Sequence, residues 1–252
     1  MPAATYQWDH RGRLTRVTLY EETFAHPVTK IIDYTYDPLD RRIRRQVDNN
    51  PSATGVPNFN DAGDIDERFA YDGNQLSFVF NAKSQQLQES YLNVPGAPEL
   101  TLARLRDTAG NASAYWLLAD HQGTVRDVIG VSIASTTPAQ HIRYDAFGHF
   151  VGIEDSSGNA VAASNRLTSL GYIGQEGDLV SGLSLHGARW YDPNLGRFIS
   201  QDPSGYDGGM DMNLYRYAFN NVSSFADPTG LVGFQVPYNG GSTSSLGLSG
   251  SN

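Results

Sequence analysis

The sequence contains no cysteine and only two lysines, Lys30 and Lys83. Without cysteine, the chain has no disulfide bridge, no thiolate metal site and no cysteine nucleophile. Arginine carries nearly all of the positive charge, and its planar guanidinium pairs with carboxylates in a fork, so many structural Arg–Asp contacts are expected. The net charge of −9 argues against a nucleic-acid-binding surface over the whole molecule.

Long apolar runs are also absent. No stretch reaches the roughly 18 consecutive apolar residues of a membrane-spanning helix, so no membrane span is predicted. The N-terminus lacks the charged-then-apolar pattern of a secretory signal. The six histidines are scattered without close metal-ligand spacing, and Gly208-Gly209 lacks the lysine of a phosphate-binding loop. The sequence therefore predicts no metal and no cofactor.

Turn-forming and aromatic residues are plentiful instead. The 252 residues include 26 glycines, 12 prolines, 14 tyrosines and 11 phenylalanines, which suits many short strands joined by turns. With 11 % aromatic and only 18 % charged residues, the chain has enough apolar material for a core. The length allows one large domain or two small ones.

An aromatic residue followed by aspartate and turn-forming residues recurs along the first 150 positions. Aspartate can accept hydrogen bonds from the amides ahead of it, and glycine adopts positive φ, so each copy predicts a β-hairpin. A degenerate copy, Asp120-His121-Gln122-Gly123, fills the longest gap, and Asp155 to Gly158 is predicted to form a further turn. The four clearest pairs are Trp8-Asp9, Tyr36-Asp37, Tyr71-Asp72 and Tyr144-Asp145.

After residue 150 the repeat gives way to an ordered series of motifs. Residues 189–193 predict a strand entering a tight turn, and residues 197–200 predict the strand that leaves it. Residues 213–221 are expected to form a short helix or an irregular turn. The motifs are Gly171-Tyr172-Ile173-Gly174-Gln175-Glu176, Ser181-Gly182-Leu183, Gly187-Ala188-Arg189-Trp190-Tyr191-Asp192-Pro193, Gly196-Arg197-Phe198, Asp202-Pro203-Ser204-Gly205, Asn213-Leu214-Tyr215-Arg216-Tyr217, Asn220-Asn221 and Asp227-Pro228-Thr229-Gly230-Leu231.

This series resembles the core region of YD-repeat (Rhs) proteins, which include bacterial polymorphic toxins, the C components of insecticidal toxin complexes and, more distantly, teneurins. The resemblance covers residues 6–231 and implies an all-β fold. Hairpins would form a curved, partly open sheet or spiral shell segment, capped by the Rhs core. It divides the chain into a YD-repeat segment (1–150), a core with a self-cleavage motif (151–231) and a Gly/Ser-rich tail (232–252).

The resemblance further implies aspartate-dependent self-cleavage after the Gly-Leu of the second Asp-Pro-x-Gly box. The scissile bond would join Leu231 and Val232. The chain would then be a single-turnover aspartyl-type autoprotease without activity in trans. The residues carried over are Asp202 as the catalytic acid, Asp227 as its partner, Asp207 and Asp211 as alternatives, and Arg197 or Arg216 as orienting groups.

The residue types agree with that chemistry. Two carboxylates a few ångströms apart share one proton, so that one can act as base while the other polarises the carbonyl. Val232 has no nucleophilic side chain, which excludes cleavage by an attack of the residue after the bond. The opposing interpretation is structural, because an aspartate that opens a proline-containing turn most often caps that turn.

Two other functions remain open at this stage. One is a non-catalytic interaction module, teneurin-like, that binds a protein or a glycan with its sheet. The weaker one is a two-carboxylate glycosidase, whose acids would flank an open cleft. The four arginines at positions 41, 42, 44 and 45 favour salt bridges to repeat aspartates over nucleic-acid binding.

The tail of 21 residues is too short to form an effector domain and is interpreted as the remnant of a variable effector region. The expected partners are the chain's own C-terminal effector polypeptide or neighbouring shell repeats. Exposed sheet edges would favour oligomers. By resemblance, the protein is expected to be secreted or exposed at the cell surface through a specialised secretion system.

Overall fold

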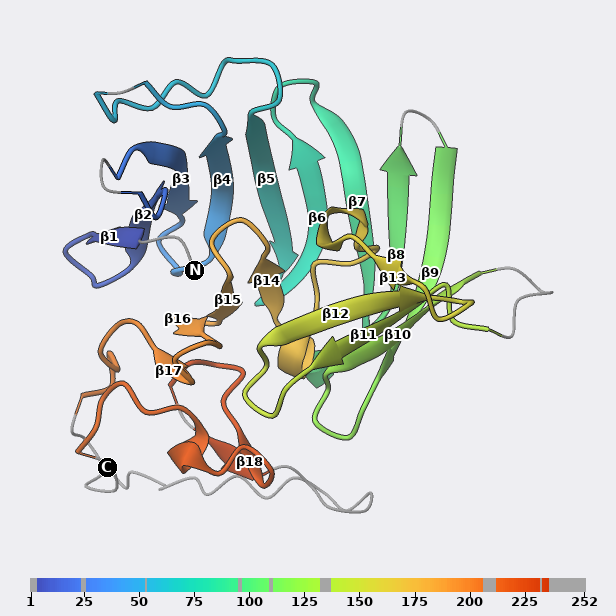
Figure 1. The fold of residues 1–252 in the computed structure, drawn as a ribbon. Helices are drawn as coiled ribbons and strands as arrows, with labels where there is room; N and C mark the ends of the chain where they lie inside the picture. Colours follow the sequence, from blue (N-terminus) through green and yellow to red (C-terminus); the bar gives the residue numbers. More distant parts are fainter. Residues whose placement is uncertain are drawn as a thin grey trace. The chain divides into compact units, whose positions relative to one another are not determined.

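The computed structural model describes residues 4–23, 26–52, 54–94, 97–108, 111–131, 137–205, 212–231 and 233–235 (Figure 1). These residues form β-strands and three short 3₁₀ turns, and no α-helix occurs among them. The predicted all-β class is confirmed. The chain divides into two compact units, Met1–Leu92 with Leu105–Ser113, and Asn93–Arg104 with Ala114–Asn252. The segments predicted above divide the chain by motif, at residues 150 and 231.

The first unit is an antiparallel sheet whose strands are neighbours in chain order. Alternate residues of these strands form its core, among them the buried pairs Val17 and Leu19 of β2 and Ile32 and Tyr34 of β3. Such an open meander is the sheet of consecutive hairpins that the repeat predicts. The strands are β1 (Ala4–Trp8), β2 (Leu14–Tyr20), β3 (Val28–Tyr36), β4 (Arg42–Asp48), β5 (Ile65–Asp72), β6 (Gln75–Asn81) and β7 (Gln86–Val94).

The YD turns share one hydrogen-bond pattern. Asp37 accepts hydrogen bonds from the amides of Leu39 and Arg41 at 2.9 and 3.0 Å, and its own amide binds the Arg41 carbonyl. The same two amide contacts, two and four residues ahead, recur at Asp9, Asp120, Asp145 and Asp155. Asp72 differs, because it pairs directly with Gln75 across a two-residue loop. Aspartate therefore defines the hairpin wherever the loop is longer.

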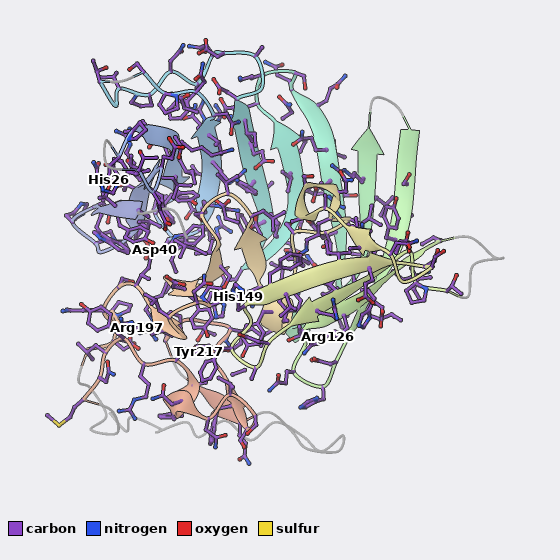
Figure 2. All side chains as sticks on the ribbon, viewed as in Figure 1. His26, Asp40, Arg126, His149, Arg197 and Tyr217 are labelled. Carbon is purple, nitrogen blue, oxygen red and sulfur yellow. The ribbon has the colours of Figure 1, made fainter. Side chains whose placement is uncertain are left out.

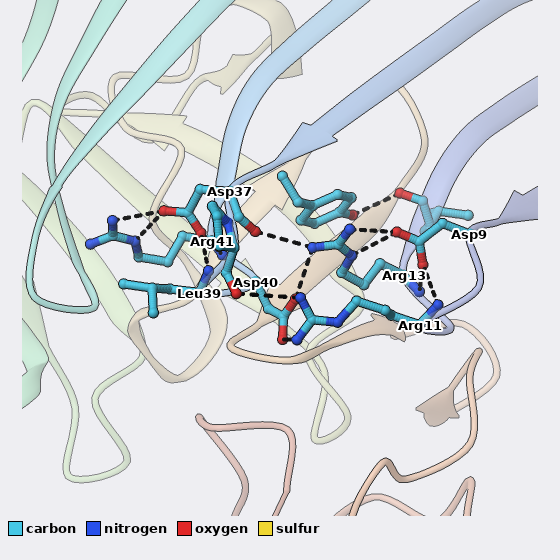
Figure 3. A network of polar contacts seen from close by, with 10 residues as sticks. Asp9, Arg11, Arg13, Asp37, Leu39, Asp40 and Arg41 are labelled. Carbon is cyan, nitrogen blue, oxygen red and sulfur yellow. Dashed lines mark hydrogen bonds and ion pairs between the residues drawn. The ribbon is translucent and has the colours of Figure 1, made fainter.

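Arginine links successive YD turns of the first unit, and Figure 3 shows this for Arg13 between the Asp9 and Asp37 turns. Arg13 forms an ion pair with Asp9 at 2.6 Å, contacts Asp40 at 2.8 Å and stacks over the ring of Tyr36. One repeat later, Arg41 pairs with Asp37 at 2.7 Å and lies over the ring of Tyr71. The expected Arg–Asp contacts are thus present, and they couple successive hairpins along one side of the sheet.

Asp37→Asn is expected to lower the free energy of unfolding of the first unit by about 1–2 kcal/mol at neutral pH, because the charged hydrogen bond to Arg41 is lost. Burial alone would raise the pKa of Asp37, but the bonds from Arg41 and the turn amides outweigh it and lower the pKa. A lowered pKa stabilises the fold above the unfolded-state pKa of about 4, and this contribution disappears as the pH falls through the folded value.

Urea unfolding at neutral pH and near pH 3 measures this effect. The difference between Asp37→Asn and the parent chain should shrink at the lower pH. Asp72→Asn is the matched control, because Asp72 follows the same tyrosine but is exposed and closes a two-residue loop. Equal losses in the two variants would contradict the structural role of the longer Asp-capped turn.

The second unit contains a meander and a separate core region. The meander includes β10 (Val125–Gly130), β11 (Gln140–Tyr144), β12 (Phe150–Asp155) and β13 (Ala160–Val161), with β9 pairing to β10. Strands β8 (Ala97–Thr108) and β9 (Asn111–Ala119) contribute residues to both units. Two of the 3₁₀ turns, η1 (Ala163–Asn165) and η2 (Tyr172–Gly174), link the meander to the core region.

The core region is built from short strands around an aromatic cluster. Strands β14 (Glu176–Asp178), β15 (Leu183–His186), β16 (Arg189–Asp192) and β17 (Arg197–Phe198) form one antiparallel sheet. Strands β18 (Phe225–Ala226) and β19 (Phe234–Gln235) form another. The strands predicted on either side of Asp192 are confirmed as β16 and β17. Residues 213–221 form the irregular turn, with the third 3₁₀ turn η3 at Ala218–Asn220.

Candidate functional site

Arg189, the first residue of β16, lies at the centre of the core region. The tight turn of Gly187 and Ala188 brings β16 back along β15, so that Arg189 pairs with His186. Its side chain is only 3 % exposed, and its guanidinium stacks 3.7 Å from the centre of the Phe198 ring. Stacking on an aromatic face suits a buried guanidinium, which still needs acceptors for its donors.

Asp202 and Asp227 supply two of those acceptors. The Oδ2 atom of Asp202 lies 2.9 Å from Nη2 of Arg189, and the Oδ2 atom of Asp227 lies 3.3 Å from the same nitrogen. The first aspartate is half-buried and the second is buried. The structure therefore brings together the two acids that open the Asp-Pro-x-Gly boxes, although 25 positions separate them in sequence.

The other oxygen of each acid is held by a turn. Ser204 donates its amide to Oδ1 of Asp202 at 2.9 Å, and Leu231 donates its amide to Oδ1 of Asp227 at 3.2 Å. Each carboxylate thus caps its turn through Oδ1 and meets the arginine through Oδ2. Structural capping and proximity of the two acids are both realised here.

The segment from Asp227 to Leu231 is held along its length by the β15–β16 turn. Ala188 donates its amide to the Thr229 carbonyl at 3.0 Å, and Nε of Arg189 donates to the Gly230 carbonyl. Gly230 has a φ of 66°, and a Cβ placed there would lie 2.2 Å from the His186 carbonyl oxygen. Only glycine permits this approach, so the second box is fitted to the turn that carries Arg189.

His186 holds the start of the same segment. Its Nδ1 lies 3.1 Å from the Asp227 carbonyl oxygen, and its Nε2 lies 2.9 Å from the Ser184 hydroxyl. A carbonyl oxygen only accepts, so Nδ1 carries the proton and Ser184 donates to Nε2. Complete burial lowers the pKa of His186 to about 3, so the ring is neutral.

Burial also sets the electrostatics of the acid pair. It raises the pKa of Asp227, although Arg189, the Thr229 hydroxyl and the backbone amides of Leu231 and Gly230 act in the opposite direction. Burial lowers the pKa of Arg189, opposed by the two aspartates. The ring of His186, which contacts the Asp227 carbonyl, packs with the rings of Tyr191 and Tyr217, with centroids 4.4 to 5.6 Å apart.

Two other predicted site residues, Arg197 and Arg216, are joined to each other by a backbone bridge; Arg197 is exposed (Figure 2) and Arg216 is half-buried. The arginine seen between the acids is Arg189. Asp207, Asp211 and Val232 lie outside the described residues.

The sequence analysis placed Arg189 in a predicted strand and counted His186 among the six scattered histidines, and it gave neither a functional role. The signal for Arg189 was electrostatic, since two acids brought together need a cation. His186 offered no comparable signal, because its role depends on the path of a segment 41 residues away.

Within the described part of the chain, no group of three His, Cys, Asp or Glu side chains is arranged to hold a metal ion. No helical segment there has the length and apolar character needed to cross a membrane.

Two of the relatives in sequence are bacterial toxins by name. The chain is 30 % identical over 206 residues to the double-stranded DNA deaminase toxin A of Burkholderia cenocepacia, covering 79 % of this chain and 14 % of that protein. It is 28 % identical over 247 residues to the toxin subunit YenC1 of Yersinia entomophaga, covering 92 % and 22 % respectively. The chain therefore spans less than a quarter of the length of these two relatives.

Solved structures show the same fold. The crystal structure of TcdB2-TccC3-TEV superposes with a TM-score of 0.64 at 23 % identity, covering 90 % of this chain and 10 % of that one. Residues 3–223 match the family described as Teneurin YD-shell, a match that includes Asp202 and ends before Asp227. The chain belongs to the Teneurin YD-shell family, and its predicted membership of the YD-repeat proteins is confirmed.

Proposed function

We propose that this chain is a shell segment of an Rhs-type toxin and that it cuts itself once, between Leu231 and Val232, with Asp202 and Asp227 as the two acids. The observation that carries the proposal is the shared contact of both acids with Arg189, which also holds the Gly230 carbonyl. One buried guanidinium thus links the acids to the residue that precedes Leu231.

The roles of the two acids follow from their surroundings. Asp227 is buried with a raised pKa, which suits it to hold the proton that polarises the Leu231 carbonyl. Asp202 is less buried and would take a proton from the attacking water. Water adds to the carbonyl carbon, the bond to the nitrogen of Val232 breaks, and that nitrogen receives a proton. The products are a carboxylate at Leu231 and a free amino group at Val232.

Arg189 keeps both acids in place and favours their ionised forms. For Asp227, Arg189 favours the ionised form whereas burial favours the protonated form. The balance between these two effects sets the fraction of Asp227 that is protonated. The bonds from Ala188, Arg189 and His186 immobilise residues 227–230, and immobilisation of the reacting segment lowers the entropic part of the barrier.

The biological role is proposed from the relatives. Their names describe toxins, including a DNA deaminase and a toxin subunit. By analogy, the shell would enclose or present an effector polypeptide that continues after Leu231, and self-cleavage would separate the two. The effector and neighbouring shell repeats are the partners, and the protein would act after secretion.

A non-catalytic scaffold is the second candidate. It is favoured by one observation, the capping of both turns through Oδ1 of Asp202 and Asp227. In that case the ion pairs with Arg189 serve only to bind the second box to the β15–β16 turn, and the sheet would be the functional surface.

Intact-mass spectrometry of the purified, folded chain separates the two. Self-cleavage predicts a product ending at Leu231 and a released segment of the last 21 residues, whereas a scaffold stays at 27.5 kDa. Asp-Pro bonds hydrolyse in acid, so samples are kept near neutral pH, and a product ending at Asp227 would count as chemical breakdown. A folded chain that stays whole over days would rule out self-cleavage by this segment.

A further inference from the structure

The residues after the proposed cut are themselves held by the core region. Phe225 and Ala226 of β18 pair in antiparallel register with Gln235 and Phe234 of β19. Asp227 follows β18 directly in sequence, and Gly233 directly precedes β19. The bond proposed for cleavage therefore belongs to the stretch of chain that connects these two paired strands.

Phe219 makes a second contact with the residues that follow the proposed cut, in addition to the strand pairing. Its ring lies against Gly233, where a Cβ would come within 3.0 Å of the ring carbon Cε2 and 3.5 Å of Cδ2. A Cβ at 3.0 Å from a ring carbon would be closer than Cβ atoms normally lie to their neighbours. A larger residue at position 233 must therefore move the ring or leave the strand.

The ring of Phe219 is supported by an aromatic neighbour. It meets Phe225 edge to face, with centroids 5.3 Å apart. Phe225 is itself in β18, so the aromatic residue that touches Gly233 is supported by the strand that pairs with residues 234 and 235. The two contacts form one surface.

The backbone that presents Phe219 is unusual. Ala218, Phe219 and Asn220 have φ values of 45°, 54° and 57°, a left-handed run of three residues with side chains. Such conformations are disfavoured and persist where surrounding structure imposes them, often at functional sites. Here the buried Tyr217 and Ala218 anchor the turn in the aromatic cluster, and Phe219 is left 40 % exposed at its tip.

We propose that Phe219, Phe225 and Ala226 form a leaving-strand subsite, which binds the segment after the cut as an added β-strand and requires a small residue at its second position. This inference rests on the proposed self-cleavage for its kinetic meaning. The substrate class is an extended polypeptide with glycine at position 233, and Phe219 is the specificity-determining residue. Strand pairing binds the segment through its backbone, and the contact of Phe219 with Gly233 selects a small residue at that position.

The physical consequence is a bond held from both sides. Leu231 is fixed through its amide to Asp227, and residues 233–235 are fixed by the subsite. A displaced leaving strand would move the scissile bond relative to the acids, and misplacement of about 1 Å can cost about a hundredfold in rate.

The test is a double-mutant cycle on the full chain, with the rate of appearance of the Leu231-ended product as readout. Gly233→Leu is expected to slow cutting by about tenfold or more, and Phe219→Ala to slow it by a smaller factor. Combining them should restore the rate toward that of Phe219→Ala, because the leucine then occupies the space left by the ring. Tyr215→Ala, which removes a comparably exposed aromatic of the same segment, is the control expected to leave the rate unchanged.

A second measurement does not need cutting. In the Asp202→Asn background, hydrogen exchange of the amides at residues 233–235 should be protected with Phe219 and accelerate about tenfold or more in Phe219→Ala. If the parent chain does not cut, the proposed function fails while the exchange result still decides on the subsite. A parent that cuts together with a Gly233→Leu variant that cuts equally fast, or unchanged exchange on loss of Phe219, overturns the subsite.

Discussion

Asp202→Asn is expected to leave the chain uncut under conditions in which the parent chain releases its C-terminal segment. Asparagine keeps the shape of the side chain, and its Oδ1 can still accept the hydrogen bond from the Ser204 amide, so the turn is preserved. It cannot take a proton from water, and loss of a general base typically costs about a hundredfold to ten-thousandfold in rate. Asp227→Asn is expected to have a comparable effect, because an amide cannot supply the acidic proton.

Asp155→Asn is the matched control for this prediction. Asp155 caps its turn through amides two and four residues ahead, as a YD aspartate does, and lies away from Arg189 in the meander. Time courses of intact mass, with thermal melting to verify folding, compare the three chains. Equal cutting by Asp202→Asn and the parent would assign both aspartates to turn capping and favour the scaffold.

Arg189→Met is expected to destabilise the second unit by about 3–5 kcal/mol at neutral pH, because it leaves two acids with no buried cation between them. Methionine approximates the volume of the arginine stem but offers none of the bonds to Gly230, Leu214 and the acids. The guanidinium is nearly fully buried, so solvent screens these contacts little.

The loss should depend on pH in a defined direction. Burial raises the pKa of Asp227 even with Arg189 present, so ionisation of this carboxylate costs folding free energy above its folded pKa and costs nothing below its unfolded pKa. Without Arg189 the folded pKa rises further. The deficit of Arg189→Met against the parent should therefore shrink as the pH falls from neutral toward the unfolded-state pKa of about 4.

Urea unfolding over this range measures the deficit. The lowered pKa of His186 comes mainly from burial, and Arg189 adds a smaller contribution. Arg126→Met is the control, since its pair with Asp120 is about one-quarter exposed and should contribute less than about 1 kcal/mol. Adding Asp227→Asn to Arg189→Met should recover part of the loss at neutral pH. A deficit that is independent of pH would mean that the arginine acts through packing alone.

The hairpins could be predicted from sequence because their chemistry is local. An aspartate that accepts hydrogen bonds from the amides two and four residues ahead depends only on the residues of its own turn. The turns at Asp9, Asp37, Asp120 and Asp145 were therefore recognisable from neighbouring residues. Asp155 makes the same contacts and was predicted only as a turn. The contacts of Arg13 with Tyr36 and Asp40 in the next turn were not predicted individually. The sequence predicted only that Arg–Asp contacts would be numerous.

The candidate site was predictable in part. Asp202 and Asp227 stood out because the same Asp-Pro-x-Gly box occurs twice, and the structure brings their carboxylates to one nitrogen. Arg197 and Arg216 were proposed as orienting groups, and in the structure they are joined to each other by a backbone bridge. Arg189 and His186 hold the second box although each lies about 40 residues from it in sequence.

The hairpin repeat and the two acid boxes follow from the sequence alone, because capped turns depend on residues within a few positions. The all-β class followed from the resemblance to YD-repeat proteins. Tertiary structure alone decided which cation joins the acids, which glycines allow the second box to cross the β15–β16 turn, and that Phe219 faces Gly233. These are contacts between segments far apart in the chain, so they depend on the folded core. Burial in that core makes an unpaired charge costly and leaves no room for an added methyl group.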